Sequence, residues 1–309
     1  MRFAPHAVSL RQFQYLVAVA DRLSFRAAAE QCHVSQPSLS AQVALAEAQL
    51  GVQIFERDKR RVLVTAAGRE ILARARALCI AGDDLFDLAR SLGDPLSGTV
   101  RIGIIPTVGP YYLPEVAPRL REAFPRLSFL WHEAKTPSLV ERLQSAELDA
   151  AIVALEAELG DVLHLAIGKD PFVFGASPSH RLAHGRGALN LDALDGEEVL
   201  LLDDGHCFRD QALAVCSRAG VAEAGFRATS LQTLVQVAAM GQGVTLLPTL
   251  AVGLENRGHP LAVRNIRDAP SRTVVLAYRV GSVLEPTLKA LVPTLTKAFD
   301  ACVPRAGAR

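Results

Sequence analysis

The chain has 309 residues, with 33 Lys and Arg against 32 Asp and Glu, and it is 50% hydrophobic and 21% charged. This balance is typical of a globular protein and excludes a disordered, collagen-like or membrane-spanning chain. No stretch approaches the ~18 uninterrupted apolar residues of a membrane span, and the first residues lack the apolar core of a secretion signal. We therefore expect a cytoplasmic protein of about two domains that does not enter a membrane.

The cysteines are too few for a disulfide scaffold and too scattered for a CxxC-type zinc site. The sequence therefore predicts no metal and no cofactor, and any cysteine chemistry would be catalytic or sensory. The five are Cys32, Cys79, Cys207, Cys216 and Cys302.

A helix-turn-helix is predicted at the start of the chain. Ser9 can cap a first helix, Ser24 a second that runs to about residue 32, and Ser35 a third that carries Pro37 in its first turn and stops at Gly51. The turn between the second and third helices is short, as in DNA-reading helix pairs. Residues at the start of the third helix would then reach base edges in a major groove. The DNA-reading candidates are Ser35, Gln36, Pro37, Ser38 and Ser40.

Residues 1–70 hold nine Lys and Arg against six Asp and Glu, and the excess lies at 57–61. Alone, such a run is usually a solvated turn. Here, short β-like runs at 52–55 and 62–64 bracket it, which predicts a two-stranded wing whose arginines contact phosphates. Together these elements predict a winged helix-turn-helix DNA-binding domain over 1–64. The phosphate-contact candidates are Arg57, Arg60 and Arg61.

A long linker helix is predicted over 65–93, capped by Thr65. Its apolar residues recur every seven positions, a heptad pattern that needs a partner helix. The glycines and proline of 93–98 then make a hinge before the second domain. The heptad residues are Ile71, Leu78, Leu85 and Leu92.

From residue 99 onward, strand and helix patterns alternate, which predicts an α/β fold with a parallel or mixed sheet covered by helices on both faces. Expected strands lie at 100–105, 127–134, 150–155, 172–176, 199–203, 244–248 and 273–278. Expected helices lie at about 111–124, 137–147, 208–219, 231–240 and 285–301.

The stretches AAAEQCHVSQPSLSAQV (27–43) and LGVQIFERDKRRVLVTAAG (50–68) closely resemble the helix-turn-helix and wing of LysR-type transcriptional regulators. The resemblance implies a two-lobed effector domain, folded like a periplasmic binding protein, over 97–303. Lobe I would hold about 97–168 and 272–303, and lobe II about 169–271. It also implies double-stranded promoter or operator DNA, RNA polymerase, and a homodimer or homotetramer as partners.

Within that family, the effector half is similar to hydrogen-peroxide sensors, most clearly at LLDDGHCFRDQALAVC (201–216). Further similar stretches are 103–114, 132–136, 226–234, 243–248 and 271–279. This resemblance implies a peroxidatic Cys207, a resolving Cys216, and glutaredoxin or thioredoxin as the reductant. The peroxide pocket would be lined by Thr107, Thr136, His206, Gln211 and Arg272.

The residues themselves allow that chemistry and leave alternatives open. Cys207 stands where a turn enters a helix, and free N–H groups there favour a thiolate, although most cysteines are simply small buried residues. Arg209 is close in sequence and could stabilise the thiolate charge, and the resemblance implies that Arg272 approaches the cysteine and does so. Thr107 and Thr136 follow strands, where ligands bind in such sheets, but each could merely cap the next helix, and capping is expected of Thr136 in either case. His206 could be a base, a pocket-positioning residue or, least favoured, a metal ligand, because no other histidine lies within ligand spacing of it.

The predicted helix also constrains the redox chemistry. Nine residues of regular helix separate two Cα atoms by roughly 13 Å, whereas a disulfide needs them within about 7 Å. A bond between Cys207 and Cys216 therefore requires this helix to unwind in part.

Three functions remain open at this point. The first is a peroxide-responsive regulator that forms this disulfide. The second is a LysR-type regulator that binds a small metabolite between the effector lobes, with incidental cysteines. The third is an enzyme, a thiol peroxidase, against which the DNA-reading domain argues.

Overall fold

The computed structural model describes residues 7–57, 61–185, 187–218, 222–257 and 260–303. The chain divides into two compact units, Met1–Ala89 and Arg90–Arg309. Within the described residues, no helix is both long and apolar enough to cross a membrane.

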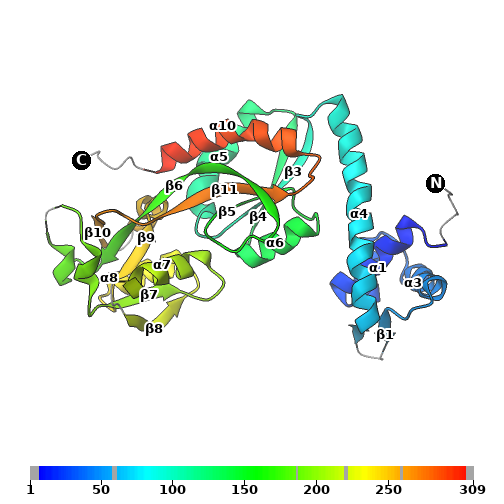
Figure 1. Cartoon of the computed structure of the whole chain (residues 1–309), viewed down its shortest axis with the longest axis horizontal. Coiled ribbons are helices and arrows are strands. Elements are labelled where there is room, and N and C mark those ends of the chain that lie inside the picture. The colour runs from blue at the N-terminus through cyan, green and yellow to red at the C-terminus, as the bar shows by residue number, and fades with distance from the viewer. Residues whose placement is uncertain (1–6, 58–60, 186, 219–221, 258–259, 304–309) are drawn as a thin grey trace. The chain divides into compact units, whose positions relative to one another are not determined.

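The first unit contains the predicted helix-turn-helix (Figure 1). Ser9, Ser24 and Ser35 each accept a hydrogen bond from a backbone N–H of the helix that follows, as predicted. Gly51 ends the third helix in the left-handed conformation, at φ 66°. The helices are α1 (Leu10–Arg22), α2 (Phe25–Gln31) and α3 (Gln36–Leu50).

An antiparallel pair, β1 (Phe55–Arg57) and β2 (Val62–Val64), forms the wing. The prediction that the first strand spans 52–55 is wrong, because the strand begins at its last residue. The backbone N–H groups of Ile54 and Phe55 donate to the Glu47 carboxylate at 2.8 and 2.9 Å. The segment before β1 is therefore bonded to α3, and its Ile54 carbonyl also accepts a hydrogen bond from the N–H of Thr65, directly after β2, at 3.0 Å.

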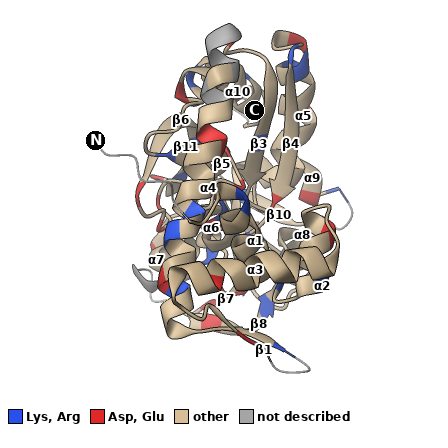
Figure 2. Cartoon of the chain, turned by 90° about the vertical axis from the view of Figure 1, so that its right-hand side faces the viewer, with Lys and Arg blue, Asp and Glu red and all other residues tan. Residues whose placement is uncertain are grey.

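The long helix α4 (Ala66–Gly93) begins as predicted, since the Thr65 hydroxyl accepts a hydrogen bond from the Gly68 N–H at 2.8 Å. Its heptad residues Leu78 and Leu85 are 51% and 65% exposed. The helix carries both arginines and acidic residues along its length (Figure 2). An exposed leucine row of this kind is available to a partner helix.

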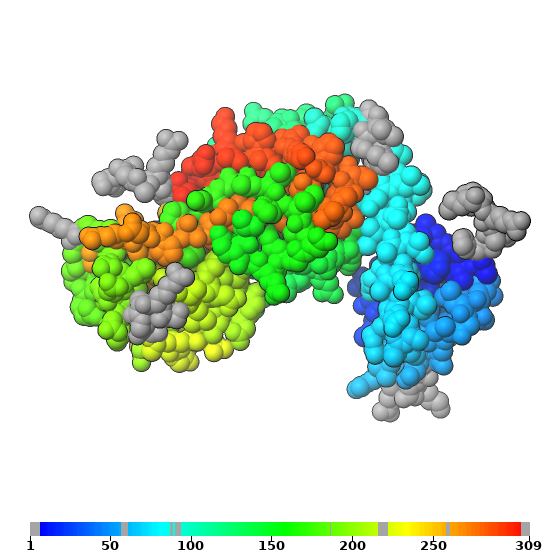
Figure 3. Space-filling model, viewed as in Figure 1, coloured from blue at the N-terminus to red at the C-terminus, as the bar shows by residue number. Residues whose placement is uncertain are grey.

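The second unit has two lobes (Figure 3), each with its own apolar core. Lobe I is built on parallel strands β3 (Gly98–Ile104), β4 (Leu127–Glu133) and β5 (Ala150–Ala154). The helices that cover it are α5 (Gly109–Ala123), α6 (Thr136–Gln144) and α10 (Glu285–Cys302). The sheet of seven strands is mixed, as predicted for an α/β fold.

Two long strands join the lobes. β6 (Val162–Ala176) pairs antiparallel with β11 (Ser271–Arg279) along its first part, and with β9 (Thr245–Pro248) and β10 (Ala262–Asn265) along its last. The predicted separate strand at 172–176 is only the end of β6. The strand continues through its polar stretch because β11 pairs with it there.

Lobe II adds a parallel pair, β7 (Glu198–Leu202) and β8 (Ala222–Ala228), and has its own apolar core. β8, α9 and β10 are not predicted by the sequence patterns. The helices of this lobe are α7 (Cys207–Arg218), α8 (Leu231–Ala239), α9 (Thr249–Glu255) and the 3₁₀ turns Arg181–Ala183 and Leu191–Leu194.

Candidate functional site: a cysteine at the lobe junction

Cys207 is the first residue of α7 and lies between the two lobes. It is half-buried and packs against the core of lobe I. The next residue, Phe208, is buried in the core of lobe II, where its ring meets that of Phe172 edge-on at 5.2 Å. The turn before the helix includes Gly205 at φ 84°, a conformation that favours glycine. The start of α7 is thus anchored in one lobe while its thiol faces the other.

A small cavity adjoins this thiol. It is a narrow gap, too tight in this structure to admit a water-sized sphere, and both lobes contribute to its wall. Three residues predicted for the peroxide pocket, Thr107, Thr136 and His206, meet Cys207 there. The full lining is Ile105, Pro106, Thr107, Lys135, Thr136, Gly205, His206 and Cys207.

Arg272 holds one wall of the cavity in place. Its Nη1 donates to the Thr107 hydroxyl at 2.7 Å, and its Nη2 donates to the Thr107 carbonyl at 2.8 Å. Its Nε and Nη2 also donate to Asp170 Oδ2, at 3.0 and 2.9 Å, and both charged side chains are fully buried. Because Asp170 and Arg272 are paired across β6 and β11, this ion pair lies where the strands cross between the lobes.

Several polar groups near Cys207 have no hydrogen-bond partner among the described residues. They are the hydroxyl of Thr136, Nε2 of His206 and the whole side-chain amide of Gln211. Gln211 lies one turn after Cys207 on α7. Buried polar groups are normally bonded, so these groups are hydrogen-bonding capacity left unused beside Cys207.

The prediction that Thr136 caps a helix is wrong. It is already the first residue of α6, the cap position belongs to Lys135, and neither α5 nor α6 has a side-chain cap. The Thr136 hydroxyl is therefore left for the cavity. The Thr107 hydroxyl is likewise bonded to Arg272 and not to the N-terminus of α5.

His206 is buried, and burial lowers the pKa of its imidazole below the usual value of 6.5. The positive charge of Lys135 lowers this pKa further, while Asp203 and a backbone hydrogen bond with Thr229 oppose the shift. The imidazole is therefore neutral at pH 7. A neutral ring can accept a proton from a thiol or bind a peroxide oxygen.

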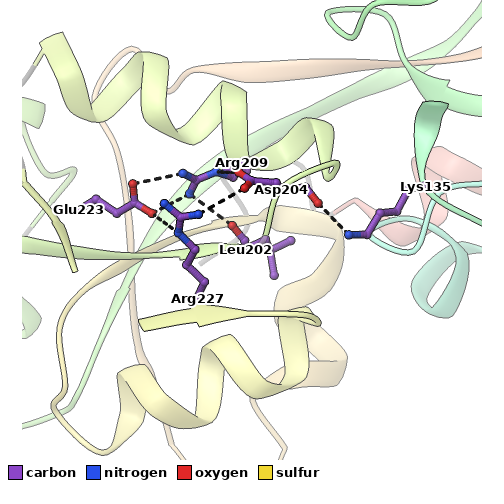
Figure 4. Close-up of polar contacts among 6 residues, drawn as sticks. All are labelled: Lys135, Leu202, Asp204, Arg209, Glu223 and Arg227. Carbon is purple, nitrogen blue, oxygen red and sulfur yellow. Dashed lines mark hydrogen bonds and ion pairs between the residues drawn. The ribbon is translucent and has the colours of Figure 1, made fainter. Parts of the chain in front are cut away.

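Arg209 takes part in an ion-pair network with Asp204 and Glu223 (Figure 4). Its Nε lies 2.9 Å from Asp204 Oδ1, and its Nη1 lies 2.8 Å from Glu223 Oε1. Arg227 contacts the same two carboxylates, at 3.3 and 3.0 Å. The charge of Arg209 is thus already balanced by acidic partners within lobe II.

Three of the other cysteines have thiols that burial makes less acidic. Burial raises the pKa of the thiols of Cys32, Cys79 and Cys302. A raised pKa leaves less of the nucleophilic thiolate. Cys216 lies on α7, as predicted, but its side chain is outside the described residues.

The DNA-reading candidates lie at the start of α3, where Ser35, Gln36, Pro37 and Ser38 are exposed and Ser40 is half-buried. In the wing, Arg61 is exposed. Arg60 and the side chain of Arg57 are outside the described residues.

Three residues of the site were not predicted from the sequence: Lys135, Asp170 and Glu223. Lys135 and Asp170 meet their partners from distant parts of the chain, so no local pattern marks them, whereas Glu223 contacts Arg227 four residues on and Arg209 fourteen residues before. For Lys135, the signal in the sequence was the stretch HEAKT (132–136), which is similar to that of hydrogen-peroxide sensors.

A second, larger cavity of about 620 Å³ lies beside the first, between the lobes. The two cavities share Pro106, Thr107, Lys135 and His206. Tyr111 closes part of the larger one by donating a hydrogen bond to Glu255 at 2.7 Å.

Family models and relatives agree over nearly the whole chain. Residues 10–69 match the bacterial regulatory helix-turn-helix protein of the lysR family, and residues 93–300 match the LysR substrate binding domain. The DNA-binding transcriptional dual regulator OxyR of Escherichia coli is 41% identical over 295 residues, which cover 95% of this chain and 96% of that protein.

Solved structures are similar as well. A cysteine-to-aspartate variant of full-length OxyR from Pseudomonas aeruginosa has a TM-score of 0.77 at 31% identity, and the match covers 96% of each chain. A cysteine-to-serine variant of Corynebacterium glutamicum OxyR, with hydrogen peroxide bound, has a TM-score of 0.66 at 32% identity and covers 98% of this chain and 95% of that one.

Proposed function

Because the chain belongs to the LysR family of bacterial helix-turn-helix regulators, we propose that it is a transcriptional regulator that senses hydrogen peroxide through Cys207. The observation that carries this proposal is the cavity at the start of α7. There a thiol, two threonines and a neutral histidine face one small space, and polar groups of Thr136 and His206 lack partners among the described residues. Peroxide both donates and accepts hydrogen bonds, which suits this set of groups.

In the first step, the Cys207 thiolate attacks one peroxide oxygen, the O–O bond breaks, and hydroxide leaves and takes up a proton to become water. This gives a sulfenic acid. In the second step, the sulfur of Cys216 attacks that of Cys207, a disulfide forms, and water leaves. A cellular dithiol of the glutaredoxin or thioredoxin class would reduce the disulfide.

The second step requires α7 to change. Both cysteines belong to this one helix, which would hold their Cα atoms roughly 13 Å apart, while a disulfide needs about 7 Å or less. Unwinding the first turns pulls on Phe208 and Ala212, which are buried in lobe II. Oxidation therefore repacks the effector domain and so can reach the DNA-binding domain.

We further propose the organisation that the sequence predicts. The DNA-binding domain spans 1–64 and the linker helix 65–93, whose exposed leucines pair with a second copy. The effector domain spans 97–303. The partners are operator DNA, RNA polymerase and at least one further copy of the chain, in the cytoplasm.

The test is one equivalent of hydrogen peroxide added to the reduced chain, followed by peptide mass mapping and DNA footprinting. The parent should lose two hydrogens between the peptides of Cys207 and Cys216 and change its footprint. Cys207→Ser should do neither, whereas the matched control Cys302→Ser should behave like the parent. Rapid oxidation at Cys79 or Cys302, with Cys207 still reduced, would contradict the proposal.

Recognition of DNA is tested separately. Arg61→Gln should weaken binding to all sequences and reduce the slope of log K against log salt by about one, as the loss of a phosphate contact does. Arg121→Gln, an exposed arginine on α5, is the control. Normal binding by Arg61→Gln at moderate salt would show that the wing does not contact phosphate.

The larger cavity favours a second candidate, a regulator that binds a small metabolite between its lobes. The same experiment separates the two. If Cys207→Ser still changes its footprint when a metabolite is added, and peroxide leaves the parent's footprint unchanged, the second candidate is correct.

A further inference from the structure

Lys135 connects the two lobes at the redox turn. Its backbone provides the cap position of α6 in lobe I, directly before Thr136. Its side chain reaches into lobe II, where Nζ donates a hydrogen bond to the carbonyl oxygen of Asp204 at 2.7 Å (Figure 4). One residue thus contacts the turn that leads into α7 from the opposite lobe.

The same turn is held from the other side by lobe II. The carboxylate of Asp204 is bonded to Arg209 and Arg227, while its carbonyl faces Lys135. The next residue, Gly205, packs closely on the lysine stem, because a Cβ atom added there would lie 3.2 Å from Lys135 Cδ. Residues 203–206 are therefore held between an ion-pair network and a single lysine.

These contacts lie next to the segment that must move. Cys207 follows the turn directly, and Lys135 lines the same cavity as Cys207 and His206. Unwinding the first turn of α7 displaces the carbonyl that Lys135 holds. The lysine hydrogen bond therefore opposes the movement that brings Cys207 toward Cys216.

We propose that Lys135 is an interlobe latch, a positioning residue that holds the 203–206 turn folded in the reduced protein and must release it before the disulfide forms. The second part rests on the peroxide-sensing function proposed above. The first part, the hold on the reduced turn, does not depend on peroxide. The lowered pKa of His206 is consistent with the lysine charge reaching the cavity.

The latch is tested by amide hydrogen exchange on the reduced full chain, without peroxide. In Lys135→Met, amides of residues 203–210 should exchange about fivefold faster, the factor expected for one hydrogen bond of ordinary strength. Lys135→Arg, which keeps a donor and the charge, should stay near the parent. Lys297→Met, an exposed lysine on α10, is the matched control and should change nothing in this segment.

A second measurement follows disulfide formation after rapid mixing with excess peroxide. Loss of the latch should speed the disulfide step in Lys135→Met by a similar factor, and Lys135→Arg should restore the parent rate. Lys135→Gln provides a second neutral variant in case the methionine disturbs folding.

The outcomes are distinct. Unchanged exchange over 203–210 in both neutral variants would overturn the latch, and so would faster exchange spread evenly over the whole effector domain. If exchange changes as expected but the parent forms no disulfide, the hold on the turn stands and the peroxide-sensing function fails. If exchange changes but the disulfide step is equally fast in the variants and the parent, the release step is overturned.

Discussion

Two arginine-centred clusters flank the start of α7, and they differ in burial. At the crossing of β6 and β11, Arg272 and Asp170 are fully buried and bonded by two hydrogen bonds. At the turn before α7, Arg209 is nearly buried, but its partners Glu223 and Asp204 are 26% and 74% exposed. The first cluster joins the lobes, whereas the second fixes only a turn within lobe II.

The difference teaches which part of the domain can move. Removing one partner of a buried ion pair leaves an uncompensated charge and typically costs about 3–5 kcal/mol. Pairs that reach solvent contribute on the order of 0–1 kcal/mol. The strand crossing is therefore the fixed part of the domain, and the turn can open without unfolding it. A switch that unwinds α7 needs this arrangement.

The largest effect is expected from a change in the buried Asp170–Arg272 ion pair at the strand crossing. Asp170→Asn leaves Arg272 buried without a counter-charge, so the free energy of unfolding of the effector domain should fall by about 3 kcal/mol or more. Urea unfolding measures the loss. Asp161→Asn, an exposed aspartate just before β6, is the control and should stay close to the parent. An equal, small loss in both variants would show that the crossing is not the stronger cluster.

A smaller effect is expected on the movable side. Glu223→Gln weakens the contacts to Arg209 and Arg227, and we expect a loss of about 1 kcal/mol in the free energy of unfolding. Its clearer consequence should be faster amide exchange in the first turns of α7. Glu198→Gln, an exposed glutamate on the paired strand β7, serves as the control. A loss as large as that of Asp170→Asn would remove the distinction between the two clusters.

The sequence predicts the elements with strong local signals. The three capping serines, Thr65 before α4 and the helix that carries Cys207 and Cys216 are all where the sequence places them. β6 was missed over its first part because Lys169, Asp170 and Pro171 are typical of a break. The strand persists there because Asp170 pairs with Arg272 across 102 residues of chain.

The same limit applies to the site. Cys207, Thr107, Thr136 and His206 lie in short stretches that resemble known sensors, and the structure places them around one cavity. The roles of Lys135 and Asp170 depend on which distant segments become neighbours. Local spacing carries no information on those contacts, so only the fold reveals them.

The smallest expected effect is a pH dependence of stability that arises from His206, in the turn before α7. The pKa of His206 is lowered in the folded protein, first by burial and then by Lys135, so the unfolded chain binds a proton more readily. The free energy of unfolding should therefore fall as the pH drops through about 6.5, the ordinary pKa of histidine. Above that pH, His206 should cause no such loss of stability.

The charged and titratable groups that line the two adjoining cavities with His206 are Tyr111, Glu133, Lys135, Cys207 and Glu255.

The measurement is the urea midpoint at pH 7.5 and pH 5.5. His206→Asn should lose less stability between these pH values than the parent. His164→Asn, an exposed histidine on β6, should keep the parent's dependence. Lys135→Met should fall between the parent and His206→Asn, because it removes one cause of the shift and leaves burial in place. If His206→Asn and the parent lost the same stability on acidification, protonation of His206 would not affect the stability of the turn. The turn would then be less stable than the strand crossing only because its ion pairs are exposed to solvent.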